Sequence, residues 1–426
     1  MRYVSEHILD ELTWRGLIAQ STDPDALRKA IDAGPITLYC GFDPTAPSLH
    51  LGNLVQILTV RRFQKAGNIP LGLVGGATGL IGDPKPSAER TLNDLDVVAN
   101  WVQRIREQIE PYLDFTGSNA ARMVNNLDWT SPLSAIDFLR DIGKHFRVNR
   151  LLAKEAISAR LNSDAGISFT EFSYQLLQAN DFLELHKRYD CVLQTGGSDQ
   201  WGNLTSGVDL IHRATGRSVH ALATPLITKA DGTKFGKTES GTIWLDPALT
   251  SPYAFFQFWV NADDRDVDGY LKVFTELPRE QIDDLAKQTA ERPAARAAQR
   301  TLAEHVTALV HGETEMRNAV AASQALFGRG DLFELDEATL NAAMAEAPSA
   351  TAQLSDGQTI VDLLVSCGLA ESKSAARRAI KEGGAYVNNT KVSDDAWGPT
   401  ASDLLKGGWL VLRRGKRHTA GVRMVR

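Results

Sequence analysis

Cysteine is scarce in this 426-residue sequence, and its three positions, Cys40, Cys191 and Cys367, lie far apart. This number and spacing exclude a disulfide framework and a Cys-x-x-Cys metal site. The sequence also lacks any apolar run that approaches the roughly 18 residues needed by a membrane-spanning helix. Residues 1–7 lack the basic and then apolar pattern of an export signal. We therefore expect a protein of the reducing cytoplasm.

A strong net charge is absent as well, because the formal net charge is −6 and charged residues make up 23% of the sequence. With 43% hydrophobic residues, the composition is that of an ordinary globular protein, and the length of 426 residues predicts two or three domains. Basic residues are nevertheless concentrated near one end, since residues 371–426 hold 12 Lys and Arg against 5 Asp and Glu. This asymmetry indicates a terminal module that meets phosphates, although a solvated basic surface gives the same pattern.

The stretch at residues 36–67 predicts a strand, a tight loop and a helix. An extended run ends at Gly41, two prolines interrupt the loop, and apolar residues then recur with helical spacing at Leu51, Leu54, Val55 and Leu58. We expect Ser48 to cap this helix and Gly67 to end it. The helix N-terminus opens beside His50, where unpaired backbone N–H groups favour an anion.

Two glycine-rich loops follow buried strands, which is typical of a parallel α/β sheet. Residues 69–84 and 191–203 each combine an apolar run with such a loop. The first loop fits neither the P-loop spacing nor the dinucleotide-binding spacing. Because ligands of such sheets bind beyond the carboxyl ends of the strands, Asp83 and Asp199 are candidates for ligand contacts. The same carboxylates would also suit a turn or a helix cap.

One predicted helix carries polar residues in a row. Along residues 169–183 the apolar positions form one stripe, and Tyr174, Gln178 and Asp181 fall together on the opposite face. A phenol, an amide and a carboxylate suit the wall of a pocket for a small zwitterion. A solvent-facing polar stripe is the other interpretation.

A polar loop with three glycines spans residues 228–241 and carries Lys234 and Lys237, three positions apart. Lysines on such a loop can converge on a polyanion, and donors that engage only in the transition state lower a reaction barrier. An exposed basic turn is the more frequent meaning of this spacing.

The second half of the sequence divides into three parts. Residues 250–327 have a helical pattern, and residues 328–357, with Gly, Pro and Ser clusters, predict a linker. Residues 358–426 predict two short helices followed by strands. A basic face of the second of these helices can follow a phosphate backbone and consists of Arg377, Arg378 and Lys381.

Taken in order, these stretches resemble the bacterial-type tyrosyl-tRNA synthetases, which are class I aminoacyl-tRNA synthetases, along essentially the whole chain. Residues 50–53, His-Leu-Gly-Asn, are similar to the HIGH signature, and residues 234–238, Lys-Phe-Gly-Lys-Thr, to the KMSKS signature. The resemblance implies an α/β fold with a Rossmann-like parallel-sheet catalytic domain at residues 1–249. It also implies that residues 250–327 form a helical anticodon-side domain and that residues 358–426 form a small α+β RNA-binding module of the type named after the fourth small-subunit ribosomal protein.

The implied reaction is activation of L-tyrosine by ATP to tyrosyl-adenylate with release of pyrophosphate, and then transfer of the tyrosyl group to the 3′ end of tRNA(Tyr). ATP is expected as a substrate, with Mg2+ bound through its phosphates. The resemblance implies no permanent cofactor, no metal site and no covalent enzyme intermediate. The expected partners are tyrosine, ATP, tRNA(Tyr) and a second copy of the chain, in the cytoplasm and away from membranes.

Carried over residue by residue, the resemblance assigns four sets of site residues. The catalytic set around the phosphates is Thr45, His50, Lys234, Lys237 and Thr238. The tyrosine-binding set is Tyr39, Asp83, Tyr174, Gln178, Asp181 and Gln200. The ATP-binding set is Gly41, Asp43, Gly52, Asn53, Gly197, Asp199 and Lys237. The tRNA-binding set is Arg377, Arg378, Lys381, Arg413 and Arg414.

Within the tyrosine set, Tyr39 and Asp181 are expected at the phenol, and phenylalanine would leave both unpaired. The ammonium group is assigned to Asp83, Tyr174 and Gln178, and the carboxylate to Gln200.

The sequence departs from the family pattern in two places. Asn53 stands where the class signature has its second histidine, and an amide can donate a hydrogen bond but cannot shuttle a proton. The loop near Lys85 is one residue shorter than the family pattern, and we take Lys85 to replace a family lysine. Arg90 matches a family arginine that acts on pyrophosphate or tRNA.

Two alternative functions stay open at this point. A tryptophanyl-tRNA synthetase has the same fold and chemistry, but Asp181 and residues 39–43 favour a phenol over an indole. A catalytically silent RNA-binding homologue would have no need of the phosphate-side residues His50, Lys234 and Lys237.

Overall fold

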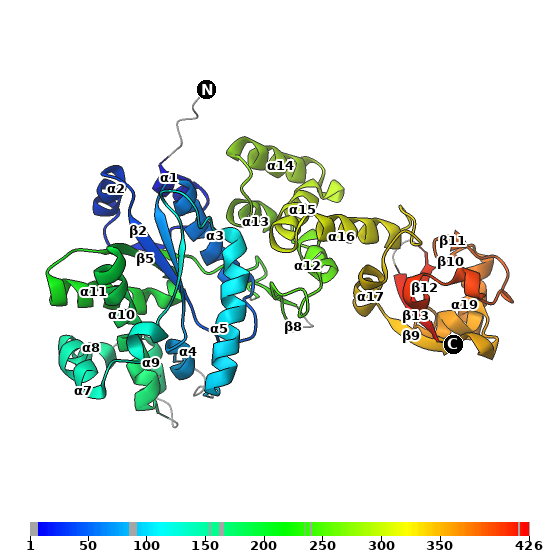
Figure 1. Ribbon diagram of the computed structural model, residues 1–426. Helices are drawn as coiled ribbons and strands as arrows, with labels where there is room; N and C mark the ends of the chain where they lie inside the picture. The colour runs from blue at the N-terminus through cyan, green and yellow to red at the C-terminus, as the bar shows by residue number, and fades with distance from the viewer. Residues whose placement is uncertain are drawn as a thin grey trace. The chain divides into compact units, whose positions relative to one another are not determined.

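The structure is a computed structural model that describes residues 7–84, 92–152, 155–161, 166–233, 235–238, 241–415 and 418–425. The chain folds into two compact units (Figure 1). The first unit comprises residues 1–246 and 272–276, and the second comprises residues 247–271 and 277–426. The chain therefore leaves the first unit, returns to it for a short segment and leaves it again.

A six-stranded sheet organises the first unit, with the strand order β1-β6-β5-β2-β3-β4. Its strands are β1 (Gln20–Ser21), β2 (Thr37–Phe42), β3 (Ile69–Val74), β4 (Arg122–Asn125), β5 (Cys191–Gly197) and β6 (His220–Thr224). Only β1 is antiparallel to its neighbour, so the predicted parallel α/β sheet is confirmed. The chain runs outward from β2 through β3 to β4 and then returns to β5 on the other side of β2. An open α/β sheet binds its ligand at such a reversal.

The helices of the first unit connect these strands and cover the sheet (Figure 1). They are α1 (Ile8–Trp14), α2 (Pro24–Asp32), α3 (Leu51–Lys65), α4 (Thr78–Ile81), α5 (Leu95–Ile109), α6 (Leu127–Thr130), α7 (Ala135–Asp137), α8 (Val148–Leu152), α9 (Glu155–Leu161), α10 (Phe169–Tyr189) and α11 (Trp201–Thr215). A small two-stranded sheet joins β7 (Lys237–Thr238) to β8 (Gly241–Thr242). In the described part of the chain, none of the helices is long and apolar enough to cross a membrane.

One apolar cluster of the first unit joins the sheet to the paired helices α10 and α11. Leu71 of β3, Phe182 of α10 and Leu210 of α11 are all buried in one cluster. The ring of Tyr39 on β2 belongs to the same cluster, and its centre lies 5.3 Å from that of Phe182. Packing of this kind fixes the backbone of β2 and α10, which both carry predicted site residues.

The second unit consists of helices followed by a second sheet. The helices are α12 (Pro252–Val260), α13 (Val267–Phe274), whose last turn belongs to the first unit, α14 (Arg279–Glu291), α15 (Ala297–His311), α16 (Glu313–Leu326), α17 (Glu337–Ala345), α18 (Ile360–Ser366) and α19 (Lys373–Lys381). The strands are β9 (Ser349–Gln353), β10 (Ala385–Val387), β11 (Thr390–Lys391), β12 (Trp409–Arg414) and β13 (His418–Val425). Their order is β11-β10-β12-β13-β9, and β9 is parallel to β13.

The prediction of a linker at residues 328–357 is wrong, because α17 and β9 both lie in this segment. Leu340 and Met344 of α17 are buried in one apolar cluster with Tyr253 of α12 and Trp409 of β12. The indole N–H of Trp409 also donates to Asn341 Oδ1 at 2.7 Å. The Gly, Pro and Ser clusters mark the ends of these short elements. The helices and the sheet of the second unit therefore share a core.

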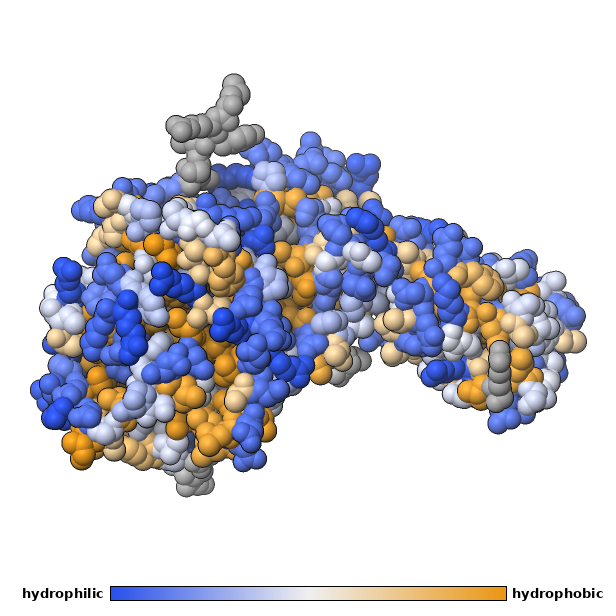
Figure 2. All heavy atoms as spheres, in the orientation of Figure 1, coloured by the Kyte–Doolittle hydropathy of each residue, from blue (hydrophilic) through white to orange (hydrophobic). Residues whose placement is uncertain are grey.

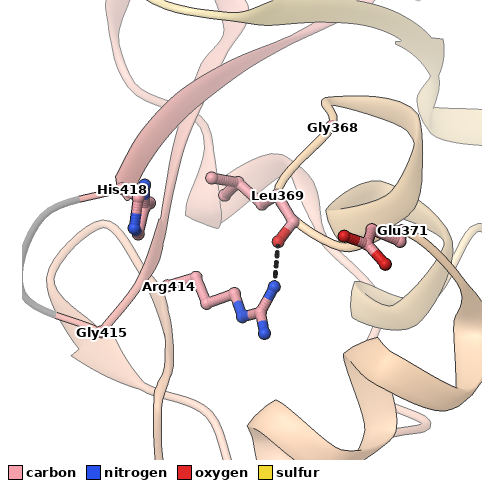
Figure 3. A pocket seen from close by; sticks show the side chains of 6 residues that line it. All are labelled: Gly368, Leu369, Glu371, Arg414, Gly415 and His418. Carbon is pink, nitrogen blue, oxygen red and sulfur yellow. Dashed lines mark hydrogen bonds between the residues drawn. The ribbon is translucent and has the colours of Figure 1, made fainter.

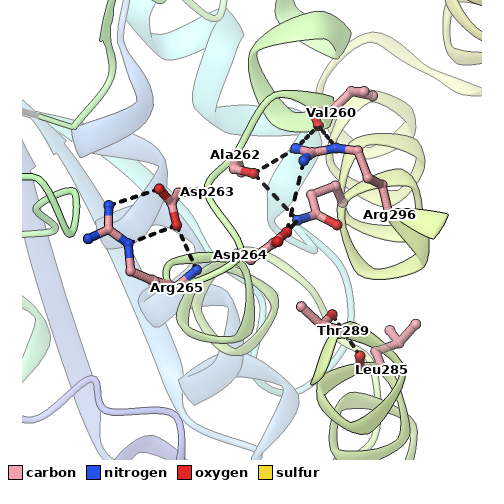
Figure 4. A network of polar contacts seen from close by, with 9 residues as sticks. Val260, Ala262, Asp263, Asp264, Arg265, Leu285, Thr289 and Arg296 are labelled. Carbon is pink, nitrogen blue, oxygen red and sulfur yellow. Dashed lines mark hydrogen bonds and ion pairs between the residues drawn. The ribbon is translucent and has the colours of Figure 1, made fainter. Parts of the chain in front are cut away.

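A strained arginine ties two helices of the second unit together (Figure 4). Arg296 lies just before α15 with a φ of 48°, a conformation that costs a non-glycine residue energy. Its Nη2 donates to the carbonyl oxygens of Val260 at 2.7 Å and of Ala262 at 2.8 Å. Because carbonyls at a helix C-terminus have no partner within the helix, Arg296 caps the end of α12.

Candidate functional site

A cavity of about 360 Å3 lies in the first unit, beyond the carboxyl ends of β2 and β5. It is lined by all six predicted tyrosine-binding residues, Tyr39, Asp83, Tyr174, Gln178, Asp181 and Gln200. It is also lined by the predicted phosphate and ATP residues Gly41, Asp43, Thr45, His50, Gly52, Asn53, Gly197 and Asp199. Segments far apart in the sequence thus meet at the reversal point of the sheet.

The remaining residues of the predicted phosphate side are only partly described. Lys234 lies outside the described residues, as do Lys85 and Arg90. For Lys237 and Thr238 the structure gives the backbone, which forms β7 and pairs Lys237 with Thr242. The roles predicted for these side chains stay predictions.

The N-terminus of α3 is capped by His50, so the expectation of a Ser48 cap is wrong. His50 Nδ1 accepts a hydrogen bond from the N–H of Gly52 at 3.1 Å, and Asn53 Oδ1 accepts one from the N–H of His50 at 3.1 Å. Because Nδ1 accepts, a neutral imidazole carries its proton on Nε2. The cap also explains Gly52, since a Cβ there would lie 2.9 Å from His50 Cε1.

Ser48 serves instead to hold the loop before His50. The hydroxyl of this buried residue donates to Leu49 O at 2.8 Å and accepts from the N–H of Asp246 at 3.2 Å. The N–H of Leu49 donates to Gln108 Oε1 on α5 at 2.9 Å, and Arg104 forms an ion pair with Asp246 at 2.6 Å. The position of His50 therefore depends on α5 and on residues 245–246, none of which the sequence pattern singled out.

Asp181 is the most enclosed carboxylate of the cavity, with 2% of its surface exposed. Its Oδ2 accepts from Asn126 Nδ2 at 2.9 Å, and its Oδ1 accepts from Trp129 Nε1 at 2.8 Å. Burial raises the pKa of Asp181 to about 7, and these two hydrogen bonds oppose the rise. Local sequence patterns could not identify Asn126 or Trp129 as partners, because they lie more than fifty positions from Asp181.

Tyr39 faces the cavity beside Asp181. Its hydroxyl is buried and has no hydrogen-bond partner among the described residues. Burial raises the pKa of Tyr39 well above its usual value, and the nearby Asp181 adds to the rise. A neutral phenol and a carboxylate at the same end of the cavity form a site for a ligand that both donates and accepts a hydrogen bond.

A second polar group joins the first glycine-rich loop to α10. Tyr174 donates its hydroxyl hydrogen to Asp43 Oδ2 at 2.6 Å, and Thr78 donates to Asp43 Oδ1 at 2.6 Å. Asn126 donates to Thr78 Oγ1 at 2.9 Å, so this group continues to Asp181. Burial, followed by Asp43, raises the pKa of Tyr174. Gly75 permits this packing, because a Cβ there would lie 1.9 Å from Asp43 Oδ1.

A third group joins the two glycine-rich loops to each other. Gln200 Nε2 donates to Asp83 Oδ2 at 3.0 Å, and Asn203 Nδ2 donates to Asp83 Oδ1 at 3.3 Å. Asp199 accepts a hydrogen bond from Gln200 at 3.3 Å. Its side chain caps neither of the helices that begin here, so the interpretation of Asp199 as a helix cap is wrong. Gln178 also lines the cavity, and its Oε1 is buried without a partner among the described residues. Both loops therefore present polar groups to a small polar ligand.

The predicted tRNA-binding residues lie in the second unit. Arg377, Arg378 and Lys381 are exposed on α19, and Arg377 forms an ion pair with Asp395 at 3.4 Å. Arg413 is only partly exposed, and its guanidinium lies over the Tyr386 ring at 4.1 Å and donates to Gly415 O at 2.8 Å.

Arg414 borders a cavity of about 470 Å3 in the second unit (Figure 3). Its Nη1 donates to Leu369 O at 3.0 Å, and Glu371 and His418 also line the cavity. An exposed arginine held in this way still presents the rest of its guanidinium to the surface.

Comparison with known proteins adds to this geometry. The model of the family described as class I tRNA synthetases (W and Y) matches residues 32–328, and that of the tyrosine–tRNA ligase SYY-like C-terminal domain matches residues 339–420. A tyrosine–tRNA ligase of Streptomyces avermitilis is 69% identical over 97% of this chain and 98% of its own.

Among solved structures, a C-terminally truncated mitochondrial tyrosyl-tRNA synthetase of Coccidioides posadasii is 30% identical with a TM-score of 0.66. The match covers 74% of this chain and 91% of that one. The corresponding enzyme of Aspergillus nidulans is 28% identical with a TM-score of 0.69, over 76% of this chain and 94% of that one.

Proposed function

The chain belongs to the tyrosine–tRNA ligases, which join tyrosine to tRNA with ATP as a substrate, and from this membership we propose a role for each part of its cavity. The cavity activates L-tyrosine to tyrosyl-adenylate, with release of pyrophosphate, and then passes the tyrosyl group to the 3′ end of tRNA(Tyr). The observation that carries these roles is the position of the Tyr39 hydroxyl near the buried carboxylate of Asp181 in the cavity.

We propose that the substrate phenol lies between these two groups. Its hydroxyl donates to Asp181, which already accepts one hydrogen bond at each oxygen, and the hydroxyl of Tyr39 supplies a further contact. Phenylalanine would leave Asp181 and Tyr39 without this partner, and an unpaired buried polar group costs about 1–3 kcal/mol. The site thereby selects tyrosine over phenylalanine.

The ammonium and carboxylate groups of tyrosine fit the middle of the cavity. Asp83, Tyr174 and Gln178 supply oxygen atoms for the ammonium group, and the unpartnered Gln178 Oε1 is an acceptor for it. Gln200 places an amide toward the substrate carboxylate. That carboxylate is the nucleophile at the α-phosphorus, so its orientation contributes to rate through positioning.

The ATP phosphates are assigned to the N-terminus of α3. Backbone N–H groups and the helix dipole favour an anion there, and Thr45 and the Nε2–H of His50 add donors. Asn53 uses its Oδ1 in the cap, which leaves its amide hydrogens for adenosine. Lys234, Lys237 and Thr238 would act on the phosphates as charge develops on the leaving pyrophosphate.

We assign adenosine to the remaining ATP-binding residues. Gly41, Gly52 and Gly197 allow the ligand to approach the backbone closely, and Asp199 accepts a hydrogen bond from a ribose hydroxyl. Mg2+ would enter with ATP on its phosphate oxygens. The cavity carboxylates suit this arrangement, because each already accepts hydrogen bonds from protein donors: Asp43, Asp83, Asp181 and Asp199.

The two alternative functions are not favoured. Curated relatives that are 56–69% identical over nearly the full chain are tyrosine–tRNA ligases, which argues against tryptophan as the amino acid. The predicted tyrosine and phosphate residues come together in one cavity, and a catalytically silent homologue would not need this arrangement.

We further propose that the chain is a cytoplasmic homodimer. The first unit exposes large apolar side chains between α6 and the start of α10: Leu127, Ile136, Leu139, Val148, Leu161 and Phe169. Figure 2 shows apolar spheres in orange at the lower edge of this unit, in the region where Figure 1 shows α7 and α9. A second copy that buries this surface would account for it.

The second unit would bind tRNA. Its helical part, residues 250–327, is assigned to the anticodon side, and residues 358–426 supply the basic surface of α19 with Arg413 and Arg414. The basic excess of residues 371–426 supports this role, because phosphate contacts dominate RNA affinity.

Tyrosine-dependent ATP–pyrophosphate exchange by the purified chain tests the proposed roles. We expect exchange with tyrosine and far less with phenylalanine or tryptophan. Exchange that is absent with tyrosine, or equal with tryptophan, would refute the proposal.

A further inference from the structure

Residues 272–276, here called the strap, return to the first unit between two segments of the second. Two buried arginines bind its carbonyl oxygens. Arg15 Nη1 donates to Lys272 O at 2.7 Å and to Thr275 O at 3.0 Å. Arg62 Nη2, from α3, donates to Val273 O at 2.8 Å and to Thr275 O at 2.9 Å. These carbonyls belong to or follow the last turn of α13, where a helix has no internal partners.

The charges around the strap are arranged to hold it in place. Burial, followed by the proximity of Arg15, lowers the pKa of Arg62 to about 9, so placing two guanidinium groups together is unfavourable by itself. Glu11 pairs with Arg15 at 2.5 Å, and Glu276 of the strap pairs with Arg61 at 3.1 Å and with Lys65. The strap therefore has a fixed position against α1 and α3.

The strap places the ring of Phe274 against the lysine-bearing loop. Phe274 is fully buried, and its ring stacks on that of Phe235 with centres 5.3 Å apart and planes 24° apart. Phe235 stands in the sequence two positions before Lys237. It is the large apolar side chain of an otherwise polar loop.

Beyond Phe235 the loop turns toward the start of α3. Gly236 has a φ of 73°, and a Cβ there would lie 3.5 Å from Leu51 Cβ. The carbonyl oxygen of Gly236 accepts from the N–H of Ile243 at 2.9 Å, and β7 follows at Lys237. The backbone that leads into Lys237 is thus held between Phe274 and the residue next to His50.

From this geometry we propose that Phe274 is a positioning residue for ATP activation. Its ring anchors Phe235 and thereby sets the backbone from which Lys237 reaches the phosphates. The inference rests on the proposed function, because it takes Lys237 to act on ATP. It adds that α3 controls both phosphate-side elements: its N-terminus through His50, and the lysine loop through Arg62 and the strap.

The test compares Phe274→Leu, Phe235→Leu and the double variant in tyrosine-dependent pyrophosphate exchange. Each single variant should lower kcat/KM for ATP roughly threefold to tenfold, the range expected for loss of one aromatic pair. The double variant should fall no further than either single variant, because both remove the same contact. Phe235→Tyr keeps the ring and should retain nearly full activity.

Tyrosine affinity measured in the absence of ATP shows whether the variants disturb only the position of the lysine loop or the structure of the unit in general. It should change less than about twofold in Phe274→Leu, because the amino-acid pocket does not include the loop. Phe256→Leu, which removes a similarly buried ring from α12 in the second unit, is the control for lost stability and should leave KM for ATP unchanged.

Two results would overturn the inference. One is a double variant whose loss equals the product of the single losses, and the other is a parallel loss of tyrosine affinity in Phe274→Leu. Failure of the unaltered chain to exchange pyrophosphate at all would instead refute the proposed function.

Discussion

At the scale of single residues, Asp181 is a buried carboxylate that lines the cavity and has a defined set of hydrogen bonds. Its two oxygens are oriented by Asn126 and Trp129, so the direction left for a ligand is set before tyrosine arrives. Such preorganisation reduces the cost of ordering the site on binding. Because its pKa is about 7, the charge of this carboxylate changes within the range of ordinary assays.

We predict that tyrosine affinity rises with pH between about 6 and 8. The phenol donates to the ionised carboxylate, and protonation below the pKa of about 7 removes an acceptor. The ionised fraction grows roughly tenfold from pH 6 to pH 8, and the association constant should follow it. Tyrosine titrations at several pH values measure this. Asp181→Asn should bind weakly with no such dependence, and a flat profile in the unaltered chain would contradict the assignment.

At the scale of elements, α3 contributes to the site at both of its ends. Its N-terminal cap uses His50 and Asn53 to satisfy backbone donors, which fixes the imidazole at the proposed phosphate site. Its C-terminal half carries Arg62, which binds the strap. A single rigid helix thus relates two loops that lie far apart in the sequence.

Asn53→Asp should separate the role of Asn53 in capping α3 from its proposed role in binding ATP. A carboxylate can still accept from the N–H of His50, and an acidic residue in the first turn stabilises a helix by about 0.3–1 kcal/mol. It also brings a negative charge and no amide hydrogens to the proposed ATP site. We expect an unchanged or slightly raised Tm and a KM for ATP raised roughly tenfold, the effect of about 1.4 kcal/mol. A normal KM for ATP would show that Asn53 acts only in the cap. Asn53→Ala, which loses both the cap and the amide hydrogens, is the comparison.

The capping of α12 by Arg296 leads to a prediction about the stability of the protein and not about its activity. Arg296→Met should reduce the free energy of unfolding by about 1–3 kcal/mol, since it removes hydrogen bonds from a charged donor to two carbonyls. Arg296→Gly should lose less, because glycine adopts the φ of 48° without strain. Thermal unfolding measures both variants. The reverse order would show that the backbone conformation costs nothing here.

At the scale of the whole molecule, the shared core of the second unit changes how its role is best tested. Deletion of residues 358–426 would remove Trp409 and expose Tyr253 and Met344, so a loss of tRNA charging would have two causes. Substitution of exposed basic residues avoids this, because α19 presents them away from its buried positions Ala376 and Ile380.

The triple variant Arg377→Ala, Arg378→Ala and Lys381→Ala should therefore impair charging and spare tyrosine activation. If each residue contacts one phosphate, the slope of log affinity for tRNA against log salt should fall by about 2–3. Filter binding at several salt concentrations measures the slope, and pyrophosphate exchange is the internal control. An unchanged slope would mean that this surface is only solvated.

Sequence patterns predicted those parts of the molecule that are determined by residues close together in the sequence. The strand and helix of residues 37–65, the parallel sheet and the polar row on α10 all follow from periodicity and glycine placement. The His50 cap was missed because it depends on the extended backbone of His50 together with the Asn53 side chain. Asn126 was missed because its partners are distant in the sequence, and α17 was missed because its core is completed by β12.

The strap also determines how short a working fragment of this chain can be. A chain cut after residue 246 would leave Arg15 and Arg62 buried without the carbonyl acceptors of residues 272–275. The smallest catalytic fragment therefore ends no earlier than Glu276 and must include residues 247–271, although these fold with the second unit. In chimeras between relatives, residues 247–276 should be exchanged as one block together with their partners on α1 and α3.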